Sequence, residues 1–215
     1  MDLKEIKNKI ASESIDIACK ERFYISSVFL PLIQFEDGIY ILFEKRANNI
    51  RQGGEISFPG GGFDDKHDKN LKDTAIRETS EELGIAKSKI EVWDGLNKVV
   101  SLIGALVYTF IGHLTITSLK ELSPNKKEVE EIFVLPLQYF LKNPPEIYHV
   151  YIEIKAEKNG EILFPVDKLG IPKRYEKKWQ RPQKYPVYVY RTKFGTIWGI
   201  TADILYDFTQ KLNKS

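Results

Sequence analysis

The sequence predicts an α/β fold in which a mixed β-sheet is sandwiched between α-helices. Three observations support this class: strand-like apolar runs fill the centre of the chain, helical patterns flank them, and no internal repeat, low-complexity tract or linker divides the 215 residues. At roughly 150 residues per domain, we expect residues 1–215 to form a single domain. Hydrophobic residues make up 42% of the chain, enough for a substantial core, so intrinsic disorder is excluded as the main state.

The first half of the chain is expected to run helix, strand, strand, short strand, helix. Leu3, Ile6 and Ile10 recur at helical spacing, which predicts a short amphipathic N-terminal helix. Two apolar runs joined by a short turn predict paired strands, and the later helix stops at Gly84, a residue typical of helix C-termini. The expected elements are residues 2–20 (helix), 23–34 and 39–45 (strands), 56–58 (strand) and 71–83 (helix).

The second half is expected to be richer in strands. An uncharged stretch at residues 99–119 has the length that crosses a bilayer. Its β-branched and small residues and its period-two alternation favour buried strands over a membrane helix. The Asn159-Gly160 pair predicts a hairpin turn. The expected elements are residues 90–117 (mostly strand), 134–141 (strand end and short helix), 148–157 and 161–165 (hairpin), 168–193 (irregular and basic) and 201–212 (helix).

Charge and cysteine content narrow the functional class. The chain has 32 Lys and Arg against 30 Asp and Glu, a net charge of +2. The protein as a whole therefore lacks the strong positive electrostatic field that would indicate nucleic acid as a partner. The basic, aromatic-rich segment 168–193 departs from this balance, with nine Lys or Arg against the single acid Glu176. The lone Cys19 excludes an internal disulfide and fits a reducing compartment. The N-terminus lacks the apolar run of a signal peptide, so we expect a cytoplasmic protein that does not span a membrane.

The chemical signal is strongest on the helix expected at residues 71–83. Glu78, Glu81 and Glu82 fall at i, i+3 and i+4, so three carboxylates crowd one face and repel one another unless cations lie among them. Oxygen ligands of this kind suit hard ions such as Mg²⁺ or Mn²⁺. A solvated acidic face paired with lysines is the alternative. The preceding triple glycine and the adjoining Arg77 favour the metal site, because this combination is far rarer than a charged face.

Residues 62–85 resemble the Nudix box, G-x5-E-x7-R-E-U-x-E-E-x-G-U, where U is an aliphatic residue. The second half matches at every specified position except Thr79, which stands where an aliphatic residue is usual. In the first half, Arg77 follows the glycine by 15 positions instead of 14, and the register of the first glutamate falls on Lys69, with Asp68 beside it. One added residue in the loop before the helix accounts for this shift.

Three further stretches resemble the coenzyme A pyrophosphatase branch of the Nudix family. Residues 46–61, RANNIRQGGEISFPGG, are similar to its upstream signature R-S-x-x-L-R-x-H-x-G-x-V-x-F-P-G-G. They are one residue shorter between Arg51 and Gly54 and lack the histidine. Residues 125–137 are similar to the DEV…F…PL segment of that branch, and residues 198–202, WGITA, to its terminal WG-x-TA.

The resemblance implies a Nudix fold and the metal-dependent hydrolysis of a nucleoside diphosphate linked to another moiety. In the similar branch, the substrate is coenzyme A or a thioester of it, and the products are 3′,5′-ADP and 4′-phosphopantetheine. The resemblance also implies that Glu78 and Glu82 are the main ligands of Mg²⁺ or Mn²⁺ and that Glu81 either completes the set or acts on the water. A main-chain carbonyl of the glycine pair at 61–62 joins them, with Gly61 taken as the ligand, and Arg77 orients the glutamates.

Other residues are candidates for catalysis and substrate binding. Glu128 aligns with the acidic residue of DEV and is the candidate general base, while Arg46 and Arg51 either grip phosphate or are ordinary surface arginines. The substrate alternatives are ADP-ribose, a dinucleotide or a nucleoside triphosphate. A different class is a non-catalytic module that binds a nucleotide or RNA. The basic segment 168–193 could stack nucleic acid, hold adenine and its phosphates, cover the site of a partner in a homodimer, or be a solvated insertion.

Overall fold

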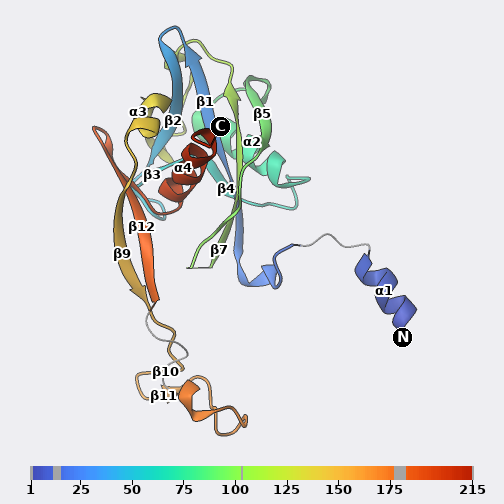
Figure 1. Ribbon diagram of the computed structural model, residues 1–215. Helices are drawn as coiled ribbons and strands as arrows, with labels where there is room; N and C mark the ends of the chain where they lie inside the picture. Colours follow the sequence, from blue (N-terminus) through green and yellow to red (C-terminus); the bar gives the residue numbers. More distant parts are fainter. Residues whose placement is uncertain (1, 12–15, 103, 177–182, 215) are drawn as a thin grey trace.

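The structure is a computed structural model that describes residues 2–11, 16–102, 104–176 and 183–214 (Figure 1). The α-helices are α1 (Leu3–Ala11), α2 (Leu71–Leu83), α3 (Leu137–Lys142) and α4 (Gly199–Leu212). The strands are β1 (Tyr24–Phe35), β2 (Gly38–Arg46), β3 (Ile56–Ser57), β4 (Gly60–Gly62), β5 (Ile90–Gly95), β6 (Val99–Val100), β7 (Ala105–Leu114), β8 (Val129–Pro136), β9 (Glu146–Ile152), β10 (Glu157–Lys158), β11 (Glu161–Ile162), β12 (Gln183–Thr192) and β13 (Gly195–Trp198).

Strand β1 lies at the centre of an eight-stranded sheet. It pairs antiparallel with β2 through a tight turn, where Phe35 is opposite Gly38, and parallel with β7. The strand order is β3-β2-β1-β7-β5, with β4 paired to β1, β6 to β7 and β8 to β2. Parallel and antiparallel pairs therefore occur in one sheet, as predicted.

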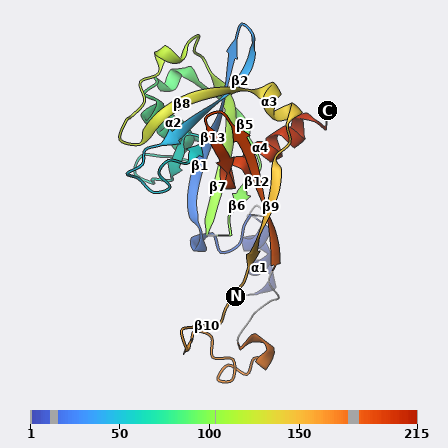
Figure 2. The same ribbon diagram turned by 90° about the vertical axis from the view of Figure 1, so that its left-hand side faces the viewer.

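Each face of this sheet has its own apolar core, because successive strand residues point to opposite faces. On one face, Leu42 belongs to a buried cluster that includes Ala75 of α2. On the other face, Phe43 belongs to a cluster that includes Leu205 of α4. Figure 2 shows α2 and α4 on opposite sides of β1 and β7. This arrangement confirms the predicted sheet between helices.

Helix α2 has the bounds predicted from the sequence, and both of its ends are capped. The side chain of Asn70 accepts a hydrogen bond from the backbone N–H of Asp73 at 3.0 Å. Gly84 ends the helix in the left-handed region, with φ of 61°. A Cβ on Gly84 would lie 2.0 Å from the carbonyl oxygen of Ser123, so a larger residue does not fit. The caps fix where the acidic residues of this helix lie.

The N-terminal helix is shorter than predicted. Helix α1 ends at Ala11, residues 12–15 lie outside the described residues, and a 3-10 turn follows at Lys20–Arg22. Helix α1 stands apart from the sheet in Figure 1. The side chain of Leu3 is 85% exposed and that of Ile6 is 39% exposed. The expectation of one helix over residues 2–20 was wrong, because three apolar residues at helical spacing locate a helix without fixing where it ends.

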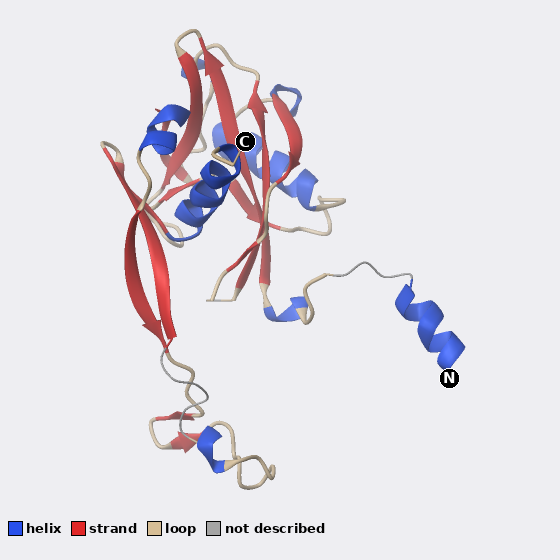
Figure 3. Ribbon diagram, viewed as in Figure 1, coloured by secondary structure: helices blue, strands red, loops and turns tan. Residues whose placement is uncertain are grey.

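The predicted hairpin about Asn159-Gly160 forms only as the two-residue strands β10 and β11. Its longer part pairs elsewhere: β9 runs antiparallel to β12, with Tyr148 opposite Val187. The segment 168–193 was therefore wrongly expected to be irregular, since it contains the ten-residue strand β12. Figure 3 shows this β9–β12 ribbon extending from the main body, with β10 and β11 beyond its end. A turn signal is local, whereas the pairing of β9 with β12 depends on contacts distant in sequence.

Within the uncharged stretch 99–119, β6 and β7 form as predicted, and residue 103 lies outside the described residues. Within the described part of the chain, no helix has both the length and the apolar character needed to cross a membrane. The other predicted strands and the final helix are also present. The structure adds β4 and starts β8 at Val129, five residues before the expected strand end.

Candidate active site

The three glutamates of α2 differ in how far they are buried. Glu82 is only 4% exposed, and its carboxylate accepts a hydrogen bond from the backbone N–H of Gly60 at 2.8 Å. The side chain of Glu78 is 18% exposed and that of Glu81 is 54% exposed. The helix therefore carries its acids from the sheet outward to solvent, with Glu82 innermost.

Arg77 holds the outer part of this acidic row. Its guanidinium donates to both carboxylate oxygens of Asp68, at 2.8 and 2.9 Å, and to Glu78 at 2.8 Å and Glu81 at 3.2 Å. The Asp68 side chain is 1% exposed and also accepts from the Thr74 hydroxyl at 2.9 Å. The guanidinium holds the pKa of Asp68 well below its usual range. This geometry suits the orienting role that the resemblance implies for Arg77.

Asp68 supplies the acidic partner at the point where the loop has its extra residue. The register of the family pattern falls on Lys69, whose side chain makes none of these contacts with Arg77. The sequence placed Asp68 beside that position but gave it no role. Only the path of the loop before α2 shows that Asp68, and not Lys69, faces Arg77.

Glu44 is a buried acid that the sequence analysis did not select. It lies on β2, is 0% exposed, and accepts a hydrogen bond from the Ser57 hydroxyl at 2.9 Å. The nearest Arg46 nitrogen is 3.7 Å from the same carboxylate oxygen. A sequence signal existed, because Glu44 continues an apolar strand run and shares the strand face of Leu42, two residues before it.

Five carboxylates influence one another electrostatically, and we call them the acidic cluster: Glu44, Glu78, Glu81, Glu82 and Glu128. Burial raises the pKa of Glu82, and the charge of Glu44 raises it further. Burial also raises the pKa of Glu44, with smaller contributions from Glu128 and Glu78. The pKa of Glu78 is raised by burial and then by Glu81 and Glu128. Glu128 lies one residue before β8, in a turn that contacts α2: its N–H donates to the carbonyl of Asn125, whose own N–H donates to the carbonyl of Glu82, both at 2.9 Å.

The glycines of β4 make room for this cluster. A Cβ on Gly61 would lie 2.4 Å from the carboxylate carbon of Glu78, so the acid occupies the space that a side chain would need. The carbonyl oxygen of Gly62 accepts from Arg77 at 3.4 Å. Of the two glycines, Gly61 is therefore the one in contact with a predicted metal ligand, while Gly62 is engaged by the arginine.

The carboxylate and carbonyl oxygens at this site suit a hard divalent cation, but their side chains do not converge on one point as the ligands of a bound ion do. No three His, Cys, Asp or Glu side chains of the described ranges converge as a group that could hold a metal ion. Arg77 and the N–H of Gly60 occupy oxygens of Glu78 and Glu82 instead. Two observations favour a cation: buried carboxylates repel one another, and one oxygen of Glu44, Oε2, is buried without a hydrogen-bond partner.

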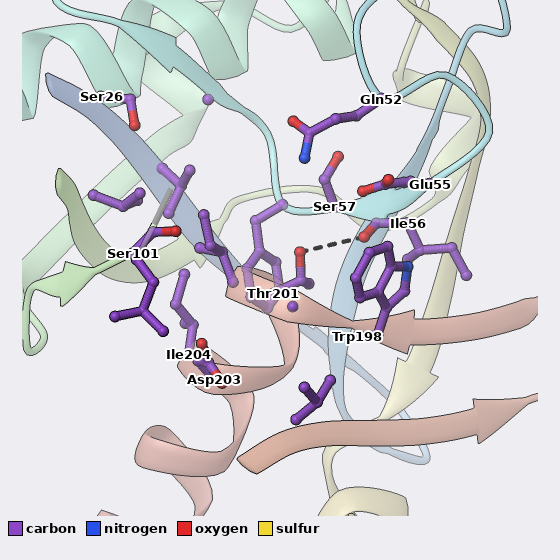
Figure 4. Close-up of a pocket in the computed structure, with 18 of the residues that line it drawn as sticks. Ser26, Gln52, Glu55, Ile56, Ser57, Ser101, Trp198, Thr201, Asp203 and Ile204 are labelled. Carbon is purple, nitrogen blue, oxygen red and sulfur yellow. Dashed lines mark hydrogen bonds between the residues drawn. The ribbon is translucent and has the colours of Figure 1, made fainter. Parts of the chain in front are cut away.

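A mostly apolar cavity of about 460 Å³ adjoins the acidic cluster. Figure 4 shows Thr201, Asp203 and Ile204 of α4 lining it, with Trp198 and Gln52 at its edges. Its lining also includes two residues that hydrogen bond to the acids, namely Gly60, bonded to Glu82, and Ser57, bonded to Glu44. The cavity and the carboxylates are therefore separated by little more than the backbone of β3 and β4.

The two arginines predicted to bind phosphate differ in where their side chains lie. Arg46 lines the cavity and lies beside Glu44, while Arg51 is exposed and contacts Arg46 only through its backbone carbonyl, at 3.3 Å. From the basic segment 168–193, the described residues in the lining are Tyr185, Pro186 and Val187. Among described residues, Arg46 is the only Lys or Arg of the lining. The described part of this segment therefore contributes an apolar wall here and no positive charge.

Comparison with known proteins agrees with this geometry. The chain matches the NUDIX domain model over residues 24–185. It is 36% identical over 124 residues to the peroxisomal coenzyme A diphosphatase NUDT7 of Mus musculus, covering 57% of this chain and 50% of that protein. It is 34% identical over 125 residues to the mitochondrial coenzyme A diphosphatase NUDT8 of Homo sapiens, covering 57% and 52%.

A longer match links the chain to the uncharacterized Nudix hydrolase NudL of Photorhabdus laumondii, with 29% identity over 187 residues, covering 87% of this chain and 84% of that protein. The chain spans about half the length of the two coenzyme A diphosphatases that it matches. The family model covers well over half of the chain and includes the acidic row on α2 and the glycines before it. The chain therefore belongs to the Nudix family.

Proposed function

We propose that this protein is a divalent-metal-dependent pyrophosphohydrolase that cleaves coenzyme A or its thioesters into 3′,5′-ADP and 4′-phosphopantetheine. The observation that carries the proposal is a cluster of carboxylates, of which Glu44 and Glu82 are buried, next to a mostly apolar cavity that Arg46 also lines. Such a site can hold a charged diphosphate at one end and an organic group at the other.

The reaction requires water to attack a phosphorus atom that is shielded by negative charge. A bound Mg²⁺ or Mn²⁺ would neutralise the diphosphate and lower the pKa of a water molecule. Glu78, Glu82 and the carbonyl of Gly61 are the proposed ligands, with Glu81 beside them. Arg77 orients Glu78 and Glu81 through the ion pairs described above.

Glu128 is the proposed general base, because its charge acts on Glu44 and Glu78 and it lies outside the α2 row. In the reaction, water adds to one phosphorus, the bridging P–O bond breaks, and two phosphate monoesters leave. The proton lost by the water passes to Glu128 and from there to solvent.

The cavity is the proposed site for the organic part of the substrate. Its volume of about 460 Å³ lies within the range of ligand pockets. The guanidinium of Arg46 offers a planar, charged donor to a phosphate at the cavity mouth. The coenzyme A diphosphatases NUDT7 and NUDT8 are named for the same substrate and support the choice of coenzyme A.

A product assay tests the proposed substrate. Coenzyme A, acetyl-coenzyme A, NADH, ADP-ribose, a diadenosine polyphosphate and a nucleoside triphosphate are each incubated with the protein and Mg²⁺ or Mn²⁺, and products are separated by chromatography. We expect 3′,5′-ADP from the coenzyme A compounds. Turnover of another compound with coenzyme A uncleaved would reject the substrate but retain the reaction. Salt-sensitive RNA binding without metal-dependent turnover would instead favour a binding module.

Arginine variants test the geometry of substrate binding. Arg46→Ala should raise KM for the cleaved substrate by about tenfold or more, because a charge-assisted hydrogen bond to phosphate contributes roughly 1.5–3 kcal/mol. Arg51→Ala is the matched control, since its side chain is exposed and does not line the cavity. Equal effects of the two substitutions would contradict the assignment of Arg46.

A further inference from the structure

Glu44 stands out within the acidic cluster because its side chain is completely buried. Its exposed fraction is 0%, whereas the side chain of Glu78 is 18% exposed and that of Glu81 is 54% exposed. A buried ionised carboxylate is costly unless it is paired or bound to a metal. The contacts of its two oxygens therefore indicate what it is for.

Only one of those oxygens has partners. Oε1 accepts the hydrogen bond from the Ser57 hydroxyl at 2.9 Å and lies 3.7 Å from a guanidinium nitrogen of Arg46. Oε2 is buried and has no hydrogen-bond partner among the described residues. Arg46 at 3.7 Å is longer than a hydrogen bond and approaches Oε1, so it does not satisfy Oε2.

The strand directs Glu44 toward the acids of α2. Leu42, two residues earlier on β2, packs in the cluster that contains Ala75 and Leu83 of α2. Residues two apart on a strand share a face, so Glu44 lies on the α2 side of the sheet. Its charge is the largest electrostatic contribution, after burial, to the raised pKa of Glu82. The charged groups that act on Glu44 are Arg46, of opposite sign, and Glu128 and Glu78, of like sign. Glu44 in turn acts on Glu82.

We propose that Glu44 is a further ligand of the divalent cation, binding it through Oε2 on the buried side of Glu82. The inference rests on the proposed metal-dependent function. A hard cation between Glu44 and Glu82 would satisfy the unpartnered oxygen and remove the repulsion between two buried carboxylates.

Metal binding to the isolated protein tests this role without using activity. Wild type, Glu44→Gln and Glu130→Gln are titrated with Mn²⁺ and followed by electron paramagnetic resonance of free Mn²⁺, and melting temperatures are recorded with and without the ion. Glutamine keeps an acceptor for Ser57 but removes the charge of residue 44. Glu130 is the matched control because it is a nearby carboxylate paired on the surface with Lys45, at 3.2 Å.

The Glu44→Gln substitution should stabilise the metal-free protein but weaken the binding of Mn²⁺. Glu44→Gln should raise the melting temperature of the metal-free protein, because a buried like charge is removed. It should also lower Mn²⁺ affinity by at least tenfold and shrink the stabilisation that Mn²⁺ provides, which scales with the ratio of ion concentration to dissociation constant. Glu130→Gln should change neither quantity. Glu44→Asp keeps the charge, but its shorter side chain moves the carboxylate oxygens back toward the strand, so it should also weaken Mn²⁺ binding. This variant replaces Glu44→Gln in the test if the glutamine variant does not fold.

Unchanged Mn²⁺ affinity in Glu44→Gln, or in Glu44→Asp if the first is insoluble, would overturn the inference, because the carboxylate of Glu44 would then contribute nothing to cation binding. The same experiments distinguish failure of this inference from failure of the proposed function. If wild type binds Mn²⁺ but leaves coenzyme A uncleaved, only the substrate proposal fails. If wild type binds no Mn²⁺ at millimolar concentration, both the metal-dependent function and the role of Glu44 are rejected.

Discussion

Replacing Gly61 with alanine is expected to remove activity while leaving the fold largely intact. The new Cβ would lie 2.4 Å from both the carboxylate carbon and one oxygen of Glu78, and ordinary contact begins near 3.4 Å. The carboxylate must therefore retreat by about 1 Å, which breaks its 2.8 Å contact with Arg77. A misplacement of about 1 Å in a catalytic arrangement can cost about 100-fold in rate, equivalent to about 2.7 kcal/mol.

The stability cost of Gly61→Ala should be small because the atoms in the way lie at the end of a flexible side chain. Overpacking costs roughly 1–3 kcal/mol, and we expect the lower end, a fall in Tm of about 2–4 °C for a chain of this size. The assay compares kcat/KM for the substrate that the product panel identifies, at saturating Mg²⁺, with Tm from thermal unfolding.

Gly60→Ala is the matched control, with the opposite balance of effects. A Cβ at residue 60 would lie 2.3 Å from the carbonyl oxygen of Ser27 and 2.6 Å from the Cα of Val28, both in the backbone of the central strand β1. Since the backbone of a buried strand cannot move aside, this variant should lose the fold itself. Full activity in Gly61→Ala, or equal loss of folding in the two variants, would refute the reasoning.

Three further substitutions test other parts of the site. Glu82→Gln should abolish metal-dependent turnover in the product assay and leave the fold intact, because the amide oxygen can still accept from the Gly60 N–H; near-normal turnover would reject the metal assignment. Asp68→Asn breaks a buried ion pair with Arg77 and should lower the unfolding free energy in urea by about 3–5 kcal/mol, and a loss below about 1 kcal/mol would contradict this. Burial raises the pKa of Asp203 from 3.8 to about 6, so the folded state binds the proton more tightly and stability falls as the pH rises between these values. Asp203→Asn should therefore raise Tm at pH 7.5 and leave it almost unchanged at pH 3, and equal shifts at both values would exclude burial of the charge as the cause.

The acidic row on α2 was predictable because its information is local. Helical periodicity places Glu78, Glu81 and Glu82 on one side of the helix, and Gly84 marks its end. The positions of β1 and β2 along the chain, and the mostly strand character of residues 90–117, followed in the same way from apolar runs and turns. Each of these features depends on residues within a few positions of one another.

The partners of that row depended on the tertiary structure. Glu44 reaches the acids of α2 because β2 packs beneath the helix, and Asp68 reaches Arg77 because of the path of one loop. The cavity wall required β9 to pair with β12, where the sequence favoured a local hairpin.

By itself the sequence determined the class of fold and the helix that carries the acids, and it led to the proposal of metal chemistry. The tertiary structure decided which carboxylates share one buried space. Among the described residues, it showed that Arg46, and not the side chain of Arg51 or the basic residues of 168–176 and 183–193, lines the cavity. The physical reason is that hydrophobic periodicity records which face of an element is buried, but not which distant element covers it. The burial of like charges, on which the proposed metal site rests, exists only once those faces meet.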